Sequence, residues 1–157
     1  MLRDETANID SSRLFIPGLE RFYAKLAPLA YAFVRIYFGA MVAWPGFEKV
    51  FLGGVERIAK GNVLKTGLEP PMFWAWAAGL TELIGGVLLV LGLFTRPAAF
   101  ALTIVLAVIT FKVQWAAGFF WQNRGYEVAL LWTLVNLAFV FGGGGRYSLD
   151  HKIGKEF

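Results

Sequence analysis

The sequence predicts an all-α protein, an integral membrane four-helix bundle, and three observations lead to this fold class. Hydrophobic residues make up 57% of the chain and charged residues only 17%, with a mean hydropathy of +0.58. A soluble domain usually has about a quarter charged residues and at most half apolar ones. The apolar residues are gathered into runs close to the roughly 20 residues that a membrane-spanning helix needs. Helices suit such runs because they satisfy their backbone polar groups within one segment.

Four apolar runs set the expected boundaries along the 157 residues. Helices are expected at about 27–45, 73–94, 97–117 and 125–142, so that residues 27–145 form one membrane domain. The first is expected to stop at Pro45–Gly46, and the four glycines 142–145 to end the last one and leave a flexible exit. Only Thr95 and Arg96 separate the second and third runs, which therefore form a tight antiparallel pair.

The segments outside the spans leave alternatives open. Residues 1–26 form a cytoplasmic or interfacial N-terminal segment, and residues 146–157 a cytoplasmic C-terminal tail. The stretch "RLFIPGLERFYAKLAPLA", residues 13–30, is either a short surface helix or the start of the first span. In the long loop after the first span, "VERIAKGNVLKTG" is either an amphipathic helix that caps a pocket or only a connector.

The basic residues in the flanks predict the orientation. Eight lie on the side of the two termini and five on the side of the two long loops, which favours cytoplasmic termini. The eight are Arg3, Arg13, Arg21, Lys25, Arg96, Arg146, Lys152 and Lys155, and the five are Lys49, Arg57, Lys60, Lys65 and Arg124.

Charged residues inside the expected spans are the main functional signal, since such residues usually face a bundle interior or a cavity. Arg35 lies near the middle of the first span, Glu82 well inside the second, Lys112 late in the third and Glu127 at the start of the fourth. Together they carry no net charge. We expect them to converge on the outer half of the bundle as a neutral network, in which Glu82 faces inward and pairs with Arg35 or Lys112.

Small residues support this arrangement. Gly79 and Gly86 share a helix face with Glu82, and Gly39 follows Arg35 by one turn. Small residues beside a charge let neighbouring helices approach closely. Two interpretations of the charges stay open. They are either a structural clasp that fixes helix register, or the lining of a polar pocket that binds a quinone-like headgroup or passes protons.

Several functional classes are excluded or disfavoured by composition. The chain has no cysteine, so it cannot ligate an iron–sulfur cluster through thiolates, and its one histidine, His151, lies in the polar tail. We therefore expect no haem, iron–sulfur or metal cofactor. The run "FGGGGRYSLD" follows an apolar helix and is not a phosphate-binding loop. The pI near 9.5 indicates topology and contact with anionic lipid rather than nucleic acid.

Four short motifs carry a resemblance to a known family. Arg35-x-x-x-Gly39 leads to "GFEK" at 46–49, and the second span reads "ELIGGVLLVLGLFTR". "GYEVALL" at 125–131 and "GGGGRYSLD" at 142–150 belong to the fourth span and its exit. In this order they resemble the DoxX family of small membrane proteins, over roughly residues 30 to 150.

The resemblance implies a bacterial inner-membrane protein, multi-pass, whose charged family positions match Arg35, Lys49, Glu82 and Glu127; Lys112 is less typical. A related branch supplies a membrane subunit of thiosulfate:quinone oxidoreductase, and other relatives assemble with a sulfurtransferase and a superoxide dismutase. Two hypotheses follow. The first is a quinone-linked redox subunit, with Glu82 and Arg35 catalytic and all five of these residues around a dissociable quinone. The second is a non-catalytic accessory or anchor subunit of a larger membrane complex. Lipid is an expected partner, a further protein subunit or a homo-oligomer is left open, and no nucleic acid is expected.

Overall fold

The computed structural model describes residues 14–155, and this part of the chain is helical with no strand. The main helices are α1 (Glu20–Phe51), α3 (Pro71–Leu91), α4 (Thr95–Val108) and α5 (Glu127–Gly142). Short helical segments join or flank them: η3 (Pro17–Leu19), α2 (Gly54–Ile58), η4 (Ala59–Val63), η5 (Leu64–Thr66), η6 (Ile109–Gln114), η7 (Trp115–Ala117), η8 (Trp121–Asn123) and α6 (Leu149–Ile153).

Three helical stretches are long and apolar enough to cross a membrane: Glu20–Phe51, Pro71–Leu91 and Thr95–Ala117. The fourth apolar helix, α5, has 16 residues. At 1.5 Å per residue it extends about 24 Å, short of the roughly 30 Å hydrocarbon core. The all-α membrane fold is confirmed, and a fourth full span stays a prediction.

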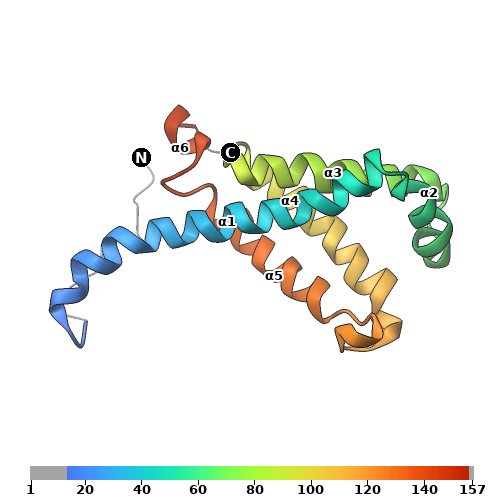
Figure 1. Ribbon diagram of the computed structural model, residues 1–157, viewed down its shortest axis with the longest axis horizontal. Helices are drawn as coiled ribbons and strands as arrows, with labels where there is room; N and C mark the ends of the chain where they lie inside the picture. The colour runs from blue at the N-terminus through green and yellow to red at the C-terminus, as the bar shows by residue number, and fades with distance from the viewer. Residues whose placement is uncertain (1–13, 156–157) are drawn as a thin grey trace.

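The first helix is longer than the sequence predicts at both ends. It does not stop at Pro45–Gly46 but continues to Phe51, because a proline in a membrane helix is tolerated when neighbouring groups satisfy the freed carbonyl. At its other end α1 begins at Glu20, so residues 20–30 are the start of the span rather than a separate surface helix. Its 32 residues extend about 48 Å, and its N-terminal part projects beyond the other helices (Figure 1).

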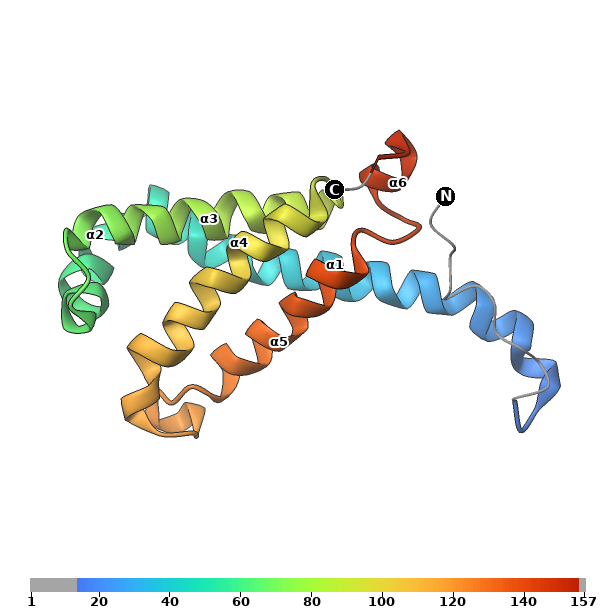
Figure 2. The same ribbon diagram turned by 180° about the vertical axis from the view of Figure 1, so that it is seen from behind.

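The main helices form two pairs that are joined at one end and separate toward the other. α1 packs along α3, α4 packs along α5, and α3 also contacts α4. We call the end with the Gly92–Phe94 turn and α6 the turn end, and the end with the 52–70 and 118–126 connections the loop end. Both views show the pairs close together at the turn end and diverging at the loop end (Figures 1 and 2).

Glycines let α1 and α3 approach closely, as the sequence predicts. A Cβ atom on Gly39 would lie 2.7 Å from the carbonyl oxygen of Gly86, and one on Gly86 would lie 2.6 Å from the carbonyl oxygen of Gly39. Such backbone contact is typical of small-residue interfaces between membrane helices. Gly46, just past the proline, continues the same interface against Leu83.

Polar side chains join α4 to α5. Asn136 is fully buried, and its Nδ2 donates hydrogen bonds to the carbonyl oxygen of Ala99 at 2.5 Å and to Oγ1 of Thr103 at 2.8 Å. The hydroxyl oxygens of Thr110 and Thr133 lie 3.3 Å apart. Hydrogen bonds of this kind between polar side chains are typical of contacts between membrane helices.

The C-terminal segment corrects the prediction of a flexible exit. The glycines do end α5, but the chain then folds back onto the turn end. The Asp150 carboxylate accepts hydrogen bonds from the backbone N–H groups of Phe94 at 2.8 Å and Thr95 at 2.9 Å. The first N–H groups of a helix have no partner within it, and Asp150 supplies one to the start of α4. The Tyr31 hydroxyl donates to the Gly143 carbonyl oxygen at 2.8 Å.

Candidate functional site

Arg35 lies at the turn end, where it joins three segments. Its side chain is fully buried, and Nη1 donates to the carbonyl oxygens of Leu89 and, at 3.1 Å, of Val90 in the last turn of α3. Its Nη2 donates to the carbonyl oxygen of Tyr147 at 2.8 Å. The last carbonyls of a helix lack the usual partner in a following turn, and Arg35 supplies donors to two of them at the end of α3.

Glu82 does not pair with Arg35 or Lys112, so that prediction is wrong. Its partner is Lys49 on α1, whose Nζ contacts Glu82 Oε2 directly. Arg35 binds α3 at Leu89, seven residues from Glu82, which is about 10 Å along the helix. The error follows from the expected end of the first helix, since only a helix that continues past Pro45 can place Lys49 against α3.

The Lys49–Glu82 pair is enclosed by the α1–α3 interface. The two side chains retain 14% and 4% of their full exposure. Gly79, one turn before Glu82, makes room for the lysine: a Cβ atom there would lie 3.2 Å from Lys49 Cβ and 3.7 Å from Lys49 Cδ. Because Gly79 has no side chain, the aliphatic part of Lys49 packs against α3 there, and its ammonium group reaches the carboxylate.

A cleft opens from this pair toward the loop end, between the two diverging helix pairs. Its volume is about 780 Å³. One wall is α1 and α3, the other is the end of α4 with η6 and the start of α5, and the helical connection 54–66 closes one side. Residues 54–66 are therefore helical and border the pocket, as one of the two sequence alternatives proposed. The polar lining residues are Lys49, Asn62, Lys65, Thr66, Glu82, Lys112, Gln114 and Arg124, and the larger apolar ones are Val42, Leu106, Ile109, Val113, Trp121, Val128 and Trp132.

The charges of the cleft do not cancel, contrary to the predicted neutral network. Four cationic side chains and one carboxylate line it, which leaves a net charge of +3. Arg35 is at the other end of the helices, and Glu127 is not part of the lining. Glu127 instead accepts a hydrogen bond at 3.2 Å from the backbone N–H of Trp121, within the α4–α5 connection. Of the residues expected to surround a headgroup, the structure brings together Lys49, Glu82 and Lys112.

The wall that carries Lys112 has an unusual backbone. Residues Ile109–Gln114 form a π-helix that continues α4, and four of its six residues line the cleft. π-Helical turns are rare and occur frequently at functional sites. Here the wider turn brings Lys112, Val113 and Gln114 to the cleft on consecutive positions.

Together these residues form an amphiphilic site. A buried protonatable pair lies in one wall, apolar side chains and two tryptophan rings also line the cleft, and three exposed cations mark its opening. Ligand pockets commonly have volumes of about 300–1,000 Å³ with a few polar groups in apolar walls. Within residues 14–155, no three His, Cys, Asp or Glu side chains are grouped as a metal would require.

Sequence reasoning did not identify the side chains that the two connections contribute to the cleft. The stretch that contains Asn62, Lys65 and Thr66 entered as a helix that caps a pocket or as a connector, without a role in the cleft for these three side chains, and Arg124 entered only as a charge that sets orientation. The two loops lie some 60 residues apart in the sequence, and no regular spacing relates Arg124 to Asn62, Lys65 and Thr66.

Known proteins resemble this chain over most of its length. The family model described as DoxX matches residues 30–115. An uncharacterised protein of Haemophilus influenzae is 38% identical over 135 residues, which are 84% of this chain and 96% of that protein. A Mycobacterium tuberculosis protein described as an uncharacterised membrane protein is 28% identical over 150 residues, 89% of this chain and 91% of its own length.

A shorter match concerns a Bacillus subtilis protein with the name "Putative oxidoreductase CatD". It is 41% identical over 70 residues, 43% of this chain and 50% of that protein. No solved structure matches the chain significantly. The match of the family model to more than half of the residues, with the charged positions Arg35, Lys49 and Glu82 inside it, shows that this chain belongs to the DoxX family.

Proposed function

We propose that this protein is a quinone-linked redox subunit of the bacterial inner membrane, with the cleft as the site of the quinone headgroup. The observation that carries the proposal is the Lys49–Glu82 pair, an acid and a base held together in the wall of a large cleft between apolar helices. Ionisable residues inside membrane segments are costly and usually functional.

The residues of the cleft fit such a headgroup. A quinone ring is flat and apolar with two carbonyl oxygens, so it needs apolar walls, room for a ring and hydrogen-bond donors. Val42, Leu106 and Trp132 supply apolar surface, and the ammonium group of Lys49 supplies a donor at the inner wall. The cleft is also open between the helix pairs, where an isoprenoid tail would lie among the apolar side chains.

The chemistry that a bound quinone supplies is the uptake of two electrons and two protons. In our proposal Lys49 donates a hydrogen bond to a ring oxygen, and Glu82 transfers protons between that oxygen and the cleft. Lys112 and Gln114, further toward the opening, connect the pair to solvent. Arg35, expected to be catalytic from the sequence, has a structural role at the turn end. The electrons come from a reduced substrate or a partner subunit.

The Bacillus subtilis relative gives this proposal limited support. Its name describes an oxidoreductase, and it matches 70 residues of this chain. The name specifies neither quinone nor substrate.

The alternative is a non-catalytic accessory or anchor subunit, and two observations favour it. The Lys49–Glu82 contact is direct, as expected of a clasp. The N-terminal part of α1 also projects from the bundle (Figure 1), and a partner or a second copy could cover its exposed side chains, among them Phe22 and Leu29.

The proposed topology has both termini in the cytoplasm and the loop end at the outer face. It rests on the basic residues near the termini and on the tryptophans at the loop end. Trp44, Trp74 and Trp76 are exposed there, as expected of rings at a membrane interface.

The first experiment is mild purification of the full chain from native membranes, followed by mass spectrometry of co-purifying proteins and extracted quinones. A stoichiometric quinone supports the redox proposal. A stoichiometric protein partner without quinone would reject it in favour of the accessory role.

A matched pair of variants then tests the cleft. Val128 lines the cleft, whereas Leu131, less than one turn later on α5, is exposed outside it. Val128→Trp fills the cleft and should remove the bound quinone, while Leu131→Trp should retain it. Equal quinone content in both variants would show that the quinone binds elsewhere.

A further inference from the structure

Three exposed cations line the cleft, and the quinone proposal uses only one of them, Lys112, in the connection to solvent. Lys65, Lys112 and Arg124 all line the cleft and are exposed. Among residues 14–155 the ion pairs are Lys49–Glu82 and Arg57–Glu48, so these three cations have no carboxylate partner there. We call them the opening cations.

The opening cations come from three separate parts of the fold. Lys65 is on η5 in the connection before α3, Lys112 is in the π-helical continuation of α4, and Arg124 is in the connection before α5. Arg124 has a left-handed backbone conformation, with φ of 62°, which a non-glycine residue seldom adopts. Three like charges around one cleft repel one another, and an anion between them would remove this repulsion.

The surroundings indicate what kind of anion fits. The wall formed by η6 and the start of α5 is apolar, with Ile109, Val113 and Val128, and the exposed ring of Trp121 also lines the cleft. Ile109 and Val113 belong to the stretch Thr95–Ala117, which is long and apolar enough to cross a membrane, and Val128 belongs to the apolar helix α5. A small hydrated anion would gain nothing from such walls, whereas an amphiphile would place its charge among the cations and its chain along the helices.

We propose that the opening cations bind the phosphate group of an anionic phospholipid, whose acyl chain lies along the apolar wall between the helix pairs. Arg124 offers a guanidinium group suited to two phosphate oxygens at once, and the two lysines add charge from the other sides. The inference does not depend on the quinone proposal, since the phosphate would lie at the opening and the Lys49–Glu82 pair at the inner wall.

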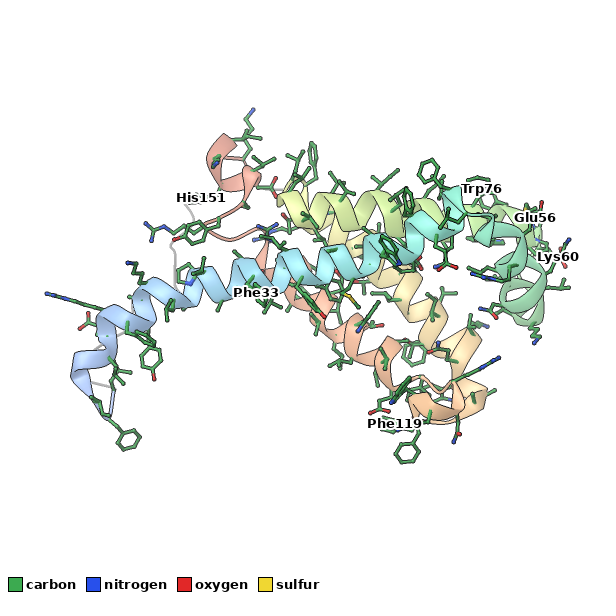
Figure 3. The ribbon with its side chains drawn as sticks, viewed as in Figure 1. Phe33, Glu56, Lys60, Trp76, Phe119 and His151 are labelled. Carbon is green, nitrogen blue, oxygen red and sulfur yellow. The ribbon has the colours of Figure 1, made fainter. Side chains whose placement is uncertain are left out.

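The test compares lipids bound to the full chain, by native mass spectrometry from nanodiscs. In one arm the nanodiscs contain phosphatidylcholine and phosphatidylglycerol. In a separate arm they contain phosphatidylcholine alone, and inorganic phosphate is added to the solution. The test variant carries Lys65→Gln, Lys112→Gln and Arg124→Gln. Its matched control carries Arg57→Gln, Lys60→Gln and Lys152→Gln, which remove the same charge at exposed positions outside the cleft; Figure 3 shows Lys60 on the outer side of its helix.

We expect one retained phosphatidylglycerol on the unchanged chain and on the control. Each basic residue near anionic lipid contributes roughly a fivefold factor in affinity, so the test variant should bind about a hundredfold more weakly. The single change Lys112→Glu should also release the lipid, and helical circular dichroism checks that each variant folds. If lipid binding weakens equally in the test variant and the control, the total charge of the protein explains the effect, and the proposal is overturned. Retention of inorganic phosphate as strong as that of the lipid would overturn the assignment to a phospholipid.

Discussion

Replacing Arg35 by methionine should release the C-terminal segment from the turn end. The guanidinium group is fully buried and donates to the carbonyl oxygens of Leu89, Val90 and Tyr147. Methionine has a similar length and keeps apolar packing, but it has no donor. The change therefore removes the Arg35 link between α1, the last turn of α3 and the segment that follows α5, while the Tyr31–Gly143 bond stays in place.

The expected magnitude follows from these bonds. A hydrogen bond to a charged group contributes about 1.5–3 kcal/mol. The Leu89 oxygen also accepts from the N–H of Gly92 at 3.2 Å, so we count only the bonds to Val90 and Tyr147. Two such bonds amount to about 3–6 kcal/mol, and we use the lower value because bonds that share one group are not additive. Since about 1.4 kcal/mol corresponds to a factor of ten, local opening should increase at least about a hundredfold.

Hydrogen exchange and proteolysis measure this opening. The amides of Phe94, Thr95 and Asp150 bond across the contact between the segment and the turn, and should exchange at least about a hundredfold faster in Arg35→Met. Trypsin should also cut faster at Arg146. Arg21→Met, an exposed position on the same helix, is the control for the loss of charge. Exchange rates that agree within about threefold in the two variants would refute the anchoring role of Arg35.

Three further outcomes are expected. Glu82→Gln should assemble normally but abolish quinone-linked turnover of the purified native complex, with Glu127→Gln as the control outside the cleft; full activity of Glu82→Gln would end the proton role of Glu82. Gly86→Leu should destabilise the protein strongly or prevent its accumulation, because a side chain there meets the backbone of α1. Val87→Leu, at the exposed neighbouring position, is the control, and equal melting temperatures of the two variants would contradict the close packing. Asn136→Leu should lower the melting temperature modestly, since hydrogen bonds between membrane helices average about 0.6 kcal/mol; no change would mean that its two bonds contribute nothing net.

Composition and the order of apolar runs were sufficient to predict the helical membrane fold. A run of about 20 apolar residues has few alternatives to a helix in lipid, and this constraint acts locally. The close packing of α1 on α3 could also be predicted from the sequence, because Gly39 and Gly86 have no side chains to keep the two backbones apart. The interhelical role of Asn136 follows in the same way from a polar group in the middle of an apolar helix.

The pairing of the charges depended on a feature that local reasoning misread. Pro45–Gly46 is a common helix end in water, but α1 continues through it, and this continuation places Lys49 beside Glu82. Register between α1 and α3 then decides which base meets the acid. Register is set by contacts all along the interface, so the presence of Arg35 and Lys112 in the sequence could not determine it.

The sequence by itself determined that this protein is helical, apolar and bound to a membrane, and that Glu82 must be enclosed, because the cost of exposing such residues to lipid depends only on their own chemistry. Tertiary structure alone decided that Lys49 is the partner of Glu82 and that Arg35 anchors the C-terminal segment. It also decided that Lys65, Lys112 and Arg124 surround one opening. Residues from distant loops meet only after the two helix pairs have packed at the turn end and diverged from it. The spacing of these residues along the chain does not indicate how far apart they lie in the fold.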